Sequence, residues 1–339
     1  MSTPILLCPT DTPDPSVIKR AGRVLRDGGL VAIPTETVYG LGANALDPRA
    51  VASIFAAKGR PSTDPLIVHV DDLAMTACVV DGPFPAPANA LAEAFWPGPL
   101  TLVLPRHASV PAAVSSGLPH VGVRCPSHPT AKAIISAAGV PIAAPSANRF
   151  GRVSPTRAAH VAAELGGRID LIIDSGPCEK GLESTVVSFD GDMALVLRHG
   201  AIPLESIAHH VTVRSVDTTT DVARASPGHD ERHYSPGTPT TTVIAGFDPS
   251  RAPAGPVLYL GYEGEEPVLP EGWRFASLGS RLDLTAIAHS LYDALRAADT
   301  GAPVRIIAEL TGESGLGRAI DDRLTRAGSS RVAKSVADL

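Results

Sequence analysis

The sequence predicts a mixed α/β protein built from two domains. The chain has 339 residues, 44% of them hydrophobic, which is more than one compact core usually holds. Up to about residue 212 the predicted strands outnumber the helices and the order does not alternate strictly, which favours a mixed sheet over a doubly wound parallel one. After residue 240 strands and helices alternate, as is typical of a small parallel α/β domain.

Caps and apolar spacing mark the first elements. Asp14-Pro15 supplies an N-cap and a first-turn proline, and Gly28-Gly29 ends the helix that follows. Asp47-Pro48 repeats the start signal for a second helix, which Gly59 ends. Apolar runs predict strands at 30–33, 66–70, 101–104, 121–124, 141–144, 171–174, 184–189, 194–198, 255–260 and 304–310. Further helices are predicted near 87–95, 129–138, 155–165, 285–299 and 316–327.

The segment 213–240 differs in composition from both sides. It combines a polar run with Ser226-Pro227-Gly228 and Ser235-Pro236-Gly237. Such proline, glycine and polar density predicts an extended linker. We therefore expect a domain at 12–212, a linker at 213–240 and a smaller domain at 241–339.

Charge and cysteine content disfavour several classes of protein. The net charge is −6 and neither part of the chain is basic, so a strong nucleic-acid-binding surface is not expected. The four cysteines are far apart with no C-x-x-C, so we expect buried thiols rather than disulfides or a zinc ribbon. There is no signal peptide and no apolar run of membrane-spanning length, which predicts a cytoplasmic protein with no membrane partner.

Three short constellations could carry chemistry. The loop 34–42 opens from a strand into hydroxyls, a carboxylate and glycines; a plain turn is the alternative, and its loose dinucleotide fingerprint is rejected because the glycines do not directly follow the strand. Lys58-Gly59-Arg60 at a helix end could clamp a triphosphate or simply complement the helix dipole. Ser146 and Asn148 follow a buried strand and could bind a ligand or cap a turn.

Single polar residues in apolar runs are harder to interpret. His69 is expected to be a satisfied core histidine, while Arg124 in a buried strand needs an anion from the protein or from a ligand. Ser184 and Arg198 mark strand ends. The histidines of His229-Asp230-Glu231-Arg232-His233 have zinc-like helical spacing, but the flanking prolines and glycines disfavour a helix, so no zinc is expected.

Taken together, these segments resemble the YrdC-type threonylcarbamoyl-AMP synthases. The motifs that carry the resemblance are Pro34–Gly42 for P-T-[DE]-T-V-Y-G-L-G, Lys58-Gly59-Arg60 with Ser146-x-Asn148 for K-x-R…S-x-N, Pro97-Gly98-Pro99-Leu100-Thr101, Arg124-Cys125-Pro126, Ser184-Thr185-Val186 and Leu197-Arg198-x-Gly200. Ser226-Pro227-Gly228 to Pro236, Gly315-Leu316-Gly317 and Arg323-Leu324 resemble the linker and C-terminal domain of the longer form. The resemblance implies a YrdC-like twisted mixed sheet with helices, followed by a smaller Rossmann-like domain.

The resemblance also implies residue roles. L-Threonine is expected at Thr37, His69, Arg124, Ala144 and Ser184, with Arg124 pairing the carboxylate. ATP is expected at Arg60, Asp64, His120, Ser146, Ser154, Arg198 and Tyr234. Lys58 and Asn148 are expected to act with Arg60 and Ser146 in catalysis, with Mg²⁺ bound to ATP. Asp64 stands where the family usually has Asn, His120 where a small hydroxyl residue is common, and Asp230-Glu231 where the linker usually has Lys-Tyr.

The implied reaction joins L-threonine, bicarbonate and ATP into L-threonylcarbamoyl-AMP and pyrophosphate. The product would serve a downstream tRNA threonylcarbamoyltransferase complex, which modifies adenosine 37 of tRNAs that read ANN codons. Three alternatives remain open from the residues: an RNA-binding module, a carbamoyltransferase that makes carbamoyl-adenylate from carbamoyl phosphate, and a non-catalytic ligand-binding regulator. Intact Lys58, Arg60, Ser146 and Asn148 argue against the last of these.

Overall fold

The computed structural model describes residues 2–216, 233–300 and 303–339, and these form two compact units. The described part of unit 1 comprises residues 2–150, 154–179 and 183–216. Unit 2 comprises Gly151–Val153, Lys180–Leu182 and the described residues from 233 onward. Most of the predicted linker, and the first four residues of the rejected zinc pattern, lie outside the described residues.

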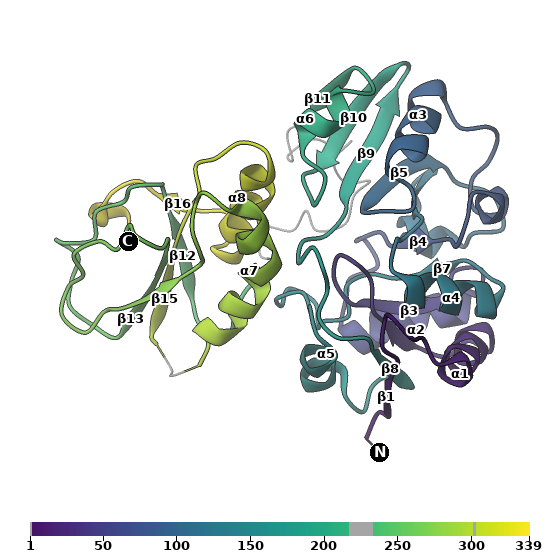
Figure 1. Ribbon diagram of the computed structural model, residues 1–339, viewed down its shortest axis with the longest axis horizontal. Helices are drawn as coiled ribbons and strands as arrows, with labels where there is room; N and C mark the ends of the chain where they lie inside the picture. Colours follow the sequence, from purple (N-terminus) through teal and green to yellow (C-terminus); the bar gives the residue numbers. More distant parts are fainter. Residues whose placement is uncertain (1, 217–232, 301–302) are drawn as a thin grey trace. The chain divides into compact units, whose positions relative to one another are not determined.

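Unit 1 is built on a mixed sheet of eleven described strands, as expected (Figure 1). Parallel and antiparallel pairs are interspersed along it; β4 and β6 are parallel, for example, while β5 and β6 are antiparallel. In spatial order the strands are β1 (Ile5–Leu7), β8 (Leu171–Asp174), β2 (Val31–Ile33), β3 (Gly40–Asn44), β7 (Ile142–Ala143), β4 (Ile67–His69), β6 (His120–Arg124), β5 (Leu100–Pro105), β9 (Thr185–Asp190), β10 (Met193–Arg198) and β11 (Val213–Ser215).

The helices of unit 1 start and stop where the caps predict. The Asp14 carboxylate accepts the Ser16 N–H at 2.8 Å, and Gly59 ends the second helix in the left-handed region at φ 66°. The helices are α1 (Pro15–Arg26), α2 (Pro48–Lys58), α3 (Ala86–Phe95), α4 (Pro129–Ala138), α5 (Ala158–Leu165) and α6 (Leu204–Ala208), with 3₁₀ turns at Ala74–Cys78 and Ala112–Ser115.

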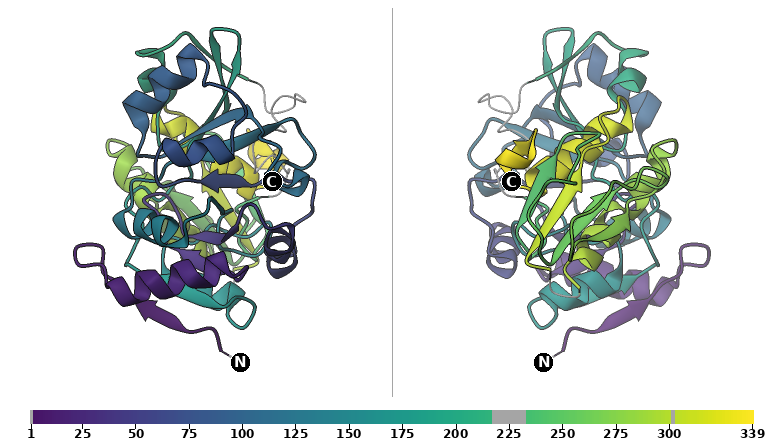
Figure 2. Two further views of the ribbon diagram at one scale, coloured as in Figure 1. Left: turned by 90° about the vertical axis from the view of Figure 1, so that its right-hand side faces the viewer. Right: turned by 90° about the vertical axis from the view of Figure 1, so that its left-hand side faces the viewer.

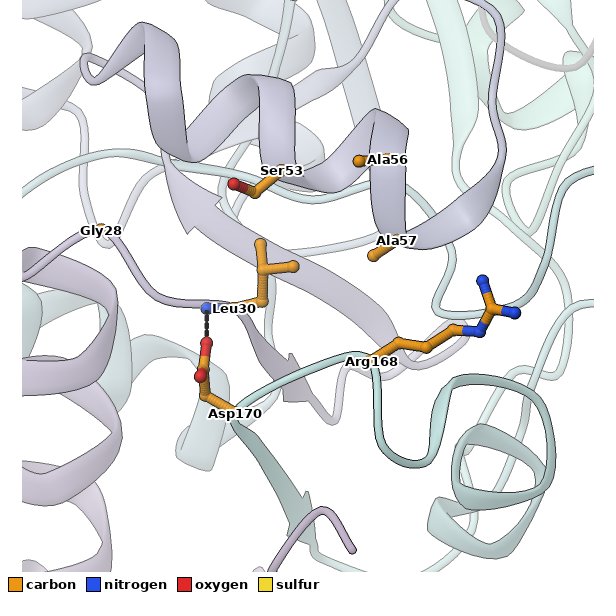
Figure 3. Close-up of a pocket in the computed structure, with 7 residues that line it drawn as sticks. All are labelled: Gly28, Leu30, Ser53, Ala56, Ala57, Arg168 and Asp170. Atoms are coloured by element: carbon orange, nitrogen blue, oxygen red, sulfur yellow. Dashed lines mark hydrogen bonds between the residues drawn. The ribbon is translucent and has the colours of Figure 1, made fainter. Parts of the chain in front are cut away.

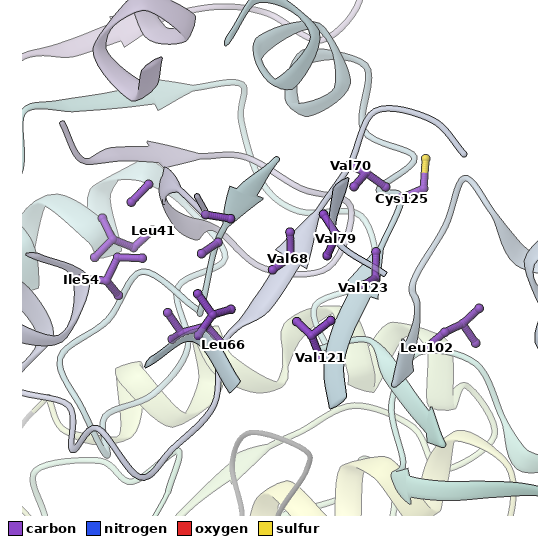
Figure 4. Close-up of a cluster of buried hydrophobic side chains, with 14 of the residues drawn as sticks. Leu41, Ile54, Leu66, Val68, Val70, Val79, Leu102, Val121, Val123 and Cys125 are labelled. Carbon is purple, nitrogen blue, oxygen red and sulfur yellow. The ribbon is translucent and has the colours of Figure 1, made fainter. Parts of the chain in front are cut away.

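Buried side chains lie on both faces of this sheet. Along β2, Val31 and Ile33 pack with α1 and α4, whereas Ala32 belongs to the larger cluster that includes Ile54 of α2 (Figure 4). This alternation follows from the period of two in a strand. α1 and α4 lie close together because Gly22 leaves room: a Cβ there would come within 2.7 Å of the Ala137 backbone.

Unit 2 contains the expected parallel α/β sheet (Figure 2). All four of its strand pairs are parallel. Its strands, in spatial order, are β14 (Arg274–Ser277), β13 (Val257–Gly261), β15 (Arg305–Glu309), β12 (Thr240–Val243) and β16 (Val332–Ala333). The helices are α7 (Leu284–Ala298) and α8 (Leu316–Ala327), with a 3₁₀ turn at Val336–Asp338. Val243, Tyr259 and Ile307 form the centre of a core on one face of this sheet.

Several elements were not predicted from the sequence. They are β1, β3, β11, β12, β14, β16 and α6. β3 was interpreted as a glycine loop, but it is a strand, which agrees with the rejection of the dinucleotide fingerprint. Cys78 is half-buried rather than buried, and the four cysteines, all within the described ranges, form no disulfide. No helix in the described part of the chain is long and apolar enough to span a membrane.

Candidate functional site

Lys58 joins two of the sequence motifs. It is the last residue of α2 and its side chain is buried. Its Nζ donates to the Ser146 carbonyl and, at 2.6 Å, to the Asn148 carbonyl. Burial, followed by the charge of Arg60, lowers the pKa of the Lys58 ammonium well below its ordinary value. An ammonium has three N–H donors, so one remains for a ligand oxygen.

Arg60 and Asp64, four residues apart in the loop after α2, form a buried ion pair. Nη2 of Arg60 lies 2.8 Å from Oδ2 of Asp64, and the two side chains are 3% and 8% exposed. The same guanidinium donates to the carbonyls of Asp64 at 3.2 Å and Pro65 at 2.7 Å. The anion that departs from the family pattern is therefore turned toward the arginine of the proposed phosphate clamp.

Arg124 holds the loop between β2 and β3 against the end of β6. Its Nη1 donates to Thr37 Oγ1 at 2.9 Å, and its Nη2 lies 2.7 Å from Oε1 of Glu36. Its Nε donates to the Gly98 carbonyl at 3.3 Å. The anion that this buried arginine needs is thus supplied by the protein, from a residue to which the sequence analysis gave no role.

Glu36 and His69 set the charge around Arg124. Burial alone would raise the pKa of Glu36, but the charge and hydrogen bonding of Arg124 outweigh it and lower that pKa below the ordinary value. His69 is the register partner of Arg124 in the parallel pair β4–β6. Burial, and then the Arg124 charge, lower the pKa of His69 to about 3, so the ring is neutral at pH 7.

Ser184 and Arg198 meet at the start of β9. The Ser184 hydroxyl lies 2.8 Å from that of Thr101, and Arg198 Nη2 donates to the Ser184 carbonyl at 2.9 Å and to its hydroxyl at 3.2 Å. Residues expected to bind different substrates are therefore in direct contact here.

Ser154 has a partner that the sequence analysis missed. Its hydroxyl donates to Oε1 of Glu183 at 2.6 Å, and both side chains are buried. The sequence could have indicated Glu183, because its carboxylate lies between the apolar Leu182 and the strand that begins at Thr185. A buried carboxylate beside two expected site residues, Ser154 and Ser184, is part of the local electrostatics of the site.

Three predicted residues do not join these contacts. His120 is exposed at the start of β6. Ala144 follows β7, and its N–H donates to the Ile67 carbonyl at 2.9 Å. Tyr234 belongs to unit 2, where it is buried and stacks on Tyr292 with ring centroids 5.8 Å apart.

A surface hollow of about 420 Å³ lies elsewhere in unit 1 (Figure 3). It is lined by Gly28, Leu30, Ser53, Ala56, Ala57, Arg168 and Asp170. The Asp170 carboxylate accepts the Leu30 N–H at 2.8 Å, and no predicted site residue lines the hollow. Within the described residues, no group of three or more His, Cys, Asp or Glu side chains could hold a metal ion.

This fold and these contacts define a YrdC-like domain joined to a second α/β unit, and two family models match accordingly. The model of Sua5, YciO and YrdC proteins, described as "Telomere recombination", matches residues 23–200. The model described as "Threonylcarbamoyl-AMP synthase, C-terminal domain" matches residues 202–329.

Similar proteins cover nearly the whole chain. A threonylcarbamoyl-AMP synthase of Bacillus subtilis is 42% identical over 334 residues, 95% of this chain and 95% of that protein. One of Pyrococcus abyssi is 41% identical, over 94% of this chain and 95% of that protein. The crystal structure of P. abyssi Sua5 complexed with L-threonine superimposes with a TM-score of 0.84 at 37% identity, over 98% of this chain and 99% of that one. The chain therefore belongs to the threonylcarbamoyl-AMP synthase family.

Proposed function

We propose that this chain makes L-threonylcarbamoyl-AMP and pyrophosphate from L-threonine, bicarbonate and ATP. It is an L-threonylcarbamoyladenylate synthase, which is a nucleotidyltransferase. The observation that carries the proposal is Lys58, a buried cation bound to the carbonyls of Ser146 and Asn148. The contact joins the two halves of the family signature and leaves a donor for a phosphate oxygen.

L-Threonine would bind at Thr37, His69, Arg124, Ala144 and Ser184. Arg124 supports this assignment because its guanidinium is buried and retains N–H donors beyond its bonds to Gly98 and Thr37. A carboxylate accepts two parallel N–H bonds from such a group. The neutral ring of His69 adds no charge to that position.

ATP would bind at Arg60, Asp64, His120, Ser146, Ser154, Arg198 and Tyr234. Arg60 and Arg198 are buried cations anchored by carbonyls of the chain, so they are oriented before a ligand arrives. Such preorganised charge is effective because no reorganisation is needed as charge develops on the leaving pyrophosphate. The ATP-binding roles of all seven residues stay predictions.

The chemistry we propose needs no covalent intermediate on the protein. The threonine amine attacks bicarbonate or CO2 to give a carbamate, and a carbamate oxygen attacks the α-phosphate and expels pyrophosphate. The chain positions the reactants and stabilises the leaving group through Lys58, Arg60 and Arg198, while Ser146 and Asn148 hold the lysine. The carbamate hydrolyses easily, so the site must exclude water during turnover.

Mg²⁺ would arrive bound to the triphosphate and neutralise part of its charge. Mg²⁺ in ATP sites usually takes one or two protein carboxylates and several phosphate oxygens, rather than a protein cage. No residue of the chain is assigned as a Mg²⁺ ligand, so phosphate oxygens would supply most of its coordination.

We also propose roles for the two domains and the linker, and a destination for the product. The domain at 12–212 carries the reaction, the linker at 213–240 closes over the reactants, and the domain at 241–339 completes the longer form. The product passes in the cytoplasm to a tRNA threonylcarbamoyltransferase complex. The two family models, which match residues 23–200 and 202–329, support the division into two domains.

Pyrophosphate release tests the proposal. The full chain is assayed with ATP and Mg²⁺, with and without L-threonine and bicarbonate. Release that requires both supports the proposed reaction, and mass spectrometry should then detect threonylcarbamoyl-AMP. Release that needs neither, or that responds to carbamoyl phosphate instead, would contradict it.

A further inference from the structure

The Arg124 guanidinium could bind a ligand carboxylate, because only some of its N–H donors have acceptors in the protein. A guanidinium has five N–H donors, and here Nε donates to Gly98 and Nη1 to Thr37. Nη2 lies 2.7 Å from Oε1 of Glu36, so this ion pair takes one of its two N–H groups. The two terminal nitrogens therefore retain N–H donors for a ligand.

The Glu36 carboxylate beside it could accept a further hydrogen bond. Its side chain is 2% exposed, and within the part of the chain that the structure describes its carboxylate pairs with Arg124 and interacts with the backbone N–H groups of Glu36 and Ser127. Its pKa is below the ordinary value, so it is ionised at neutral pH. A carboxylate has about four lone-pair sites, so one remains for an N–H group of a ligand ammonium.

The charges around this pair sum to zero. Arg124 contributes +1 and Glu36 −1, while the pKa of His69 is lowered to about 3, so its ring is neutral at pH 7. His128 interacts electrostatically with Glu36, and burial lowers its pKa below the ordinary value for histidine. A zwitterion keeps this sum at zero, whereas a lone carboxylate would leave one buried charge without a partner.

We propose that Glu36 is a specificity-determining residue that fits the Arg124 receptor to a zwitterionic amino acid. Arg124 takes the α-carboxylate, and Glu36 takes the ammonium in the same buried place. The inference rests on the proposed threonine-binding role of Arg124 and adds to it a reason for the site to prefer amino acids over carboxylates that lack an amine. Thr37, bonded to Arg124 at 2.9 Å, fixes the loop so that the two charges stay adjacent.

Two ligands that differ only in the amine test this inference. L-Threonine and (R)-3-hydroxybutyrate, which is threonine without its amino group, are titrated calorimetrically into the full chain. The wild-type protein should bind threonine at least about tenfold more tightly, because each buried pairing is worth more than a surface one. Equal affinity for the two ligands would overturn the proposal without any variant.

Glu36→Gln removes the charge and keeps the shape. The ratio of the two dissociation constants should fall about tenfold or more in this variant, with tighter binding of (R)-3-hydroxybutyrate to the uncompensated Arg124. Glu36→Asp keeps the charge and should keep the direction of the preference; the exposed Glu93→Gln is the matched control. A folded Glu36→Gln that keeps the wild-type ratio refutes the role of Glu36. Threonine-dependent pyrophosphate release by the wild-type chain shows separately that the proposed function stands.

Discussion

Replacing Asp64 with Asn should strengthen ATP binding, because Asp64 competes with the triphosphate for Arg60. The two side chains form a buried ion pair at 2.8 Å. The asparagine amide has nearly the same shape, and its oxygen can still accept from the guanidinium. Arg60 also keeps its bonds to the carbonyls of residue 64 and Pro65. The substitution therefore removes charge while the geometry is largely retained.

The size of the effect follows from Coulomb's law. A phosphate oxygen bound on the other side of the guanidinium would lie roughly 7 Å from the carboxylate, judged from two ordinary hydrogen-bond lengths and the width of the group. At an effective dielectric constant of about 20, two like charges at that distance repel by about 2 kcal/mol. That is roughly 30-fold in an equilibrium constant, and screening by salt and Mg²⁺ reduces it, so we expect the KM for ATP to fall about tenfold.

Initial rates of pyrophosphate release, at saturating threonine and bicarbonate, measure this KM. The KM for threonine should not change, and the exposed Asp190→Asn serves as the control. Loss of one partner of a buried pair costs stability, so the free variant should unfold at a lower temperature and ATP should restore more of the difference than in the wild type. A KM for ATP that stays the same or rises would refute the competition and would fit Asp64 as a ligand of the nucleotide's Mg²⁺.

Three further predictions use other residues of the structure. Arg60→Ala should lower pyrophosphate release at least about 100-fold, since it removes a preorganised charge at the leaving group; near-wild-type rates would exclude Arg60 from the clamp. Because the pKa of Lys58 lies below its ordinary value, and ATP prefers the charged ammonium, calorimetric ATP affinity should fall as pH rises through that lowered pKa and before an ordinary lysine would titrate; Lys58→Arg should abolish this pH dependence, and its persistence would assign it to another group. In unit 2, Glu309→Gln should cost about 3 kcal/mol in chemical unfolding, because Glu309 accepts from Arg281 and Tyr259 in a buried network; a change below about 0.5 kcal/mol would contradict that account.

Local signals in the sequence predicted the helices better than the small strands. Asp14 and Asp47 cap α1 and α2 as expected, and Gly59 ends α2 in the left-handed region. β3 was missed because its glycines suggest a loop, whereas the sheet requires them: a Cβ on Gly42 would come within 3.0 Å of Ile142 on the neighbouring strand. That requirement comes from a contact made far along the chain, which local propensity does not contain.

The sequence indicated which residues belong to the site, but not which of their side chains pair with one another. Burial of Arg124 in an apolar strand implied an anion, yet the sequence alone did not distinguish a protein carboxylate from a ligand. The structure supplies Glu36 from the loop between β2 and β3, which three strands of the chain separate from Arg124 in β6. In the same way Asp64 was recognised as a departure from the family pattern, while its pairing with Arg60 needed coordinates. Side-chain pairing depends on tertiary distances that motif spacing does not encode.

The partners of Lys58, Arg60 and Arg124 differ in charge, and this difference divides these cations into two groups. Lys58 is held by the carbonyls of Ser146 and Asn148, which orient it without neutralising it, so its positive charge stays available to a polyanion. Arg124 is held by a carboxylate, which cancels its charge and suits it to a ligand that is neutral overall. Arg60 is expected to bind phosphate like Lys58, yet its partner is a carboxylate, that of Asp64. Asn at position 64 would leave Arg60 with uncharged partners only, as Lys58 has. The substitution therefore tests whether the partner of a cation, and not its position alone, decides which substrate it binds.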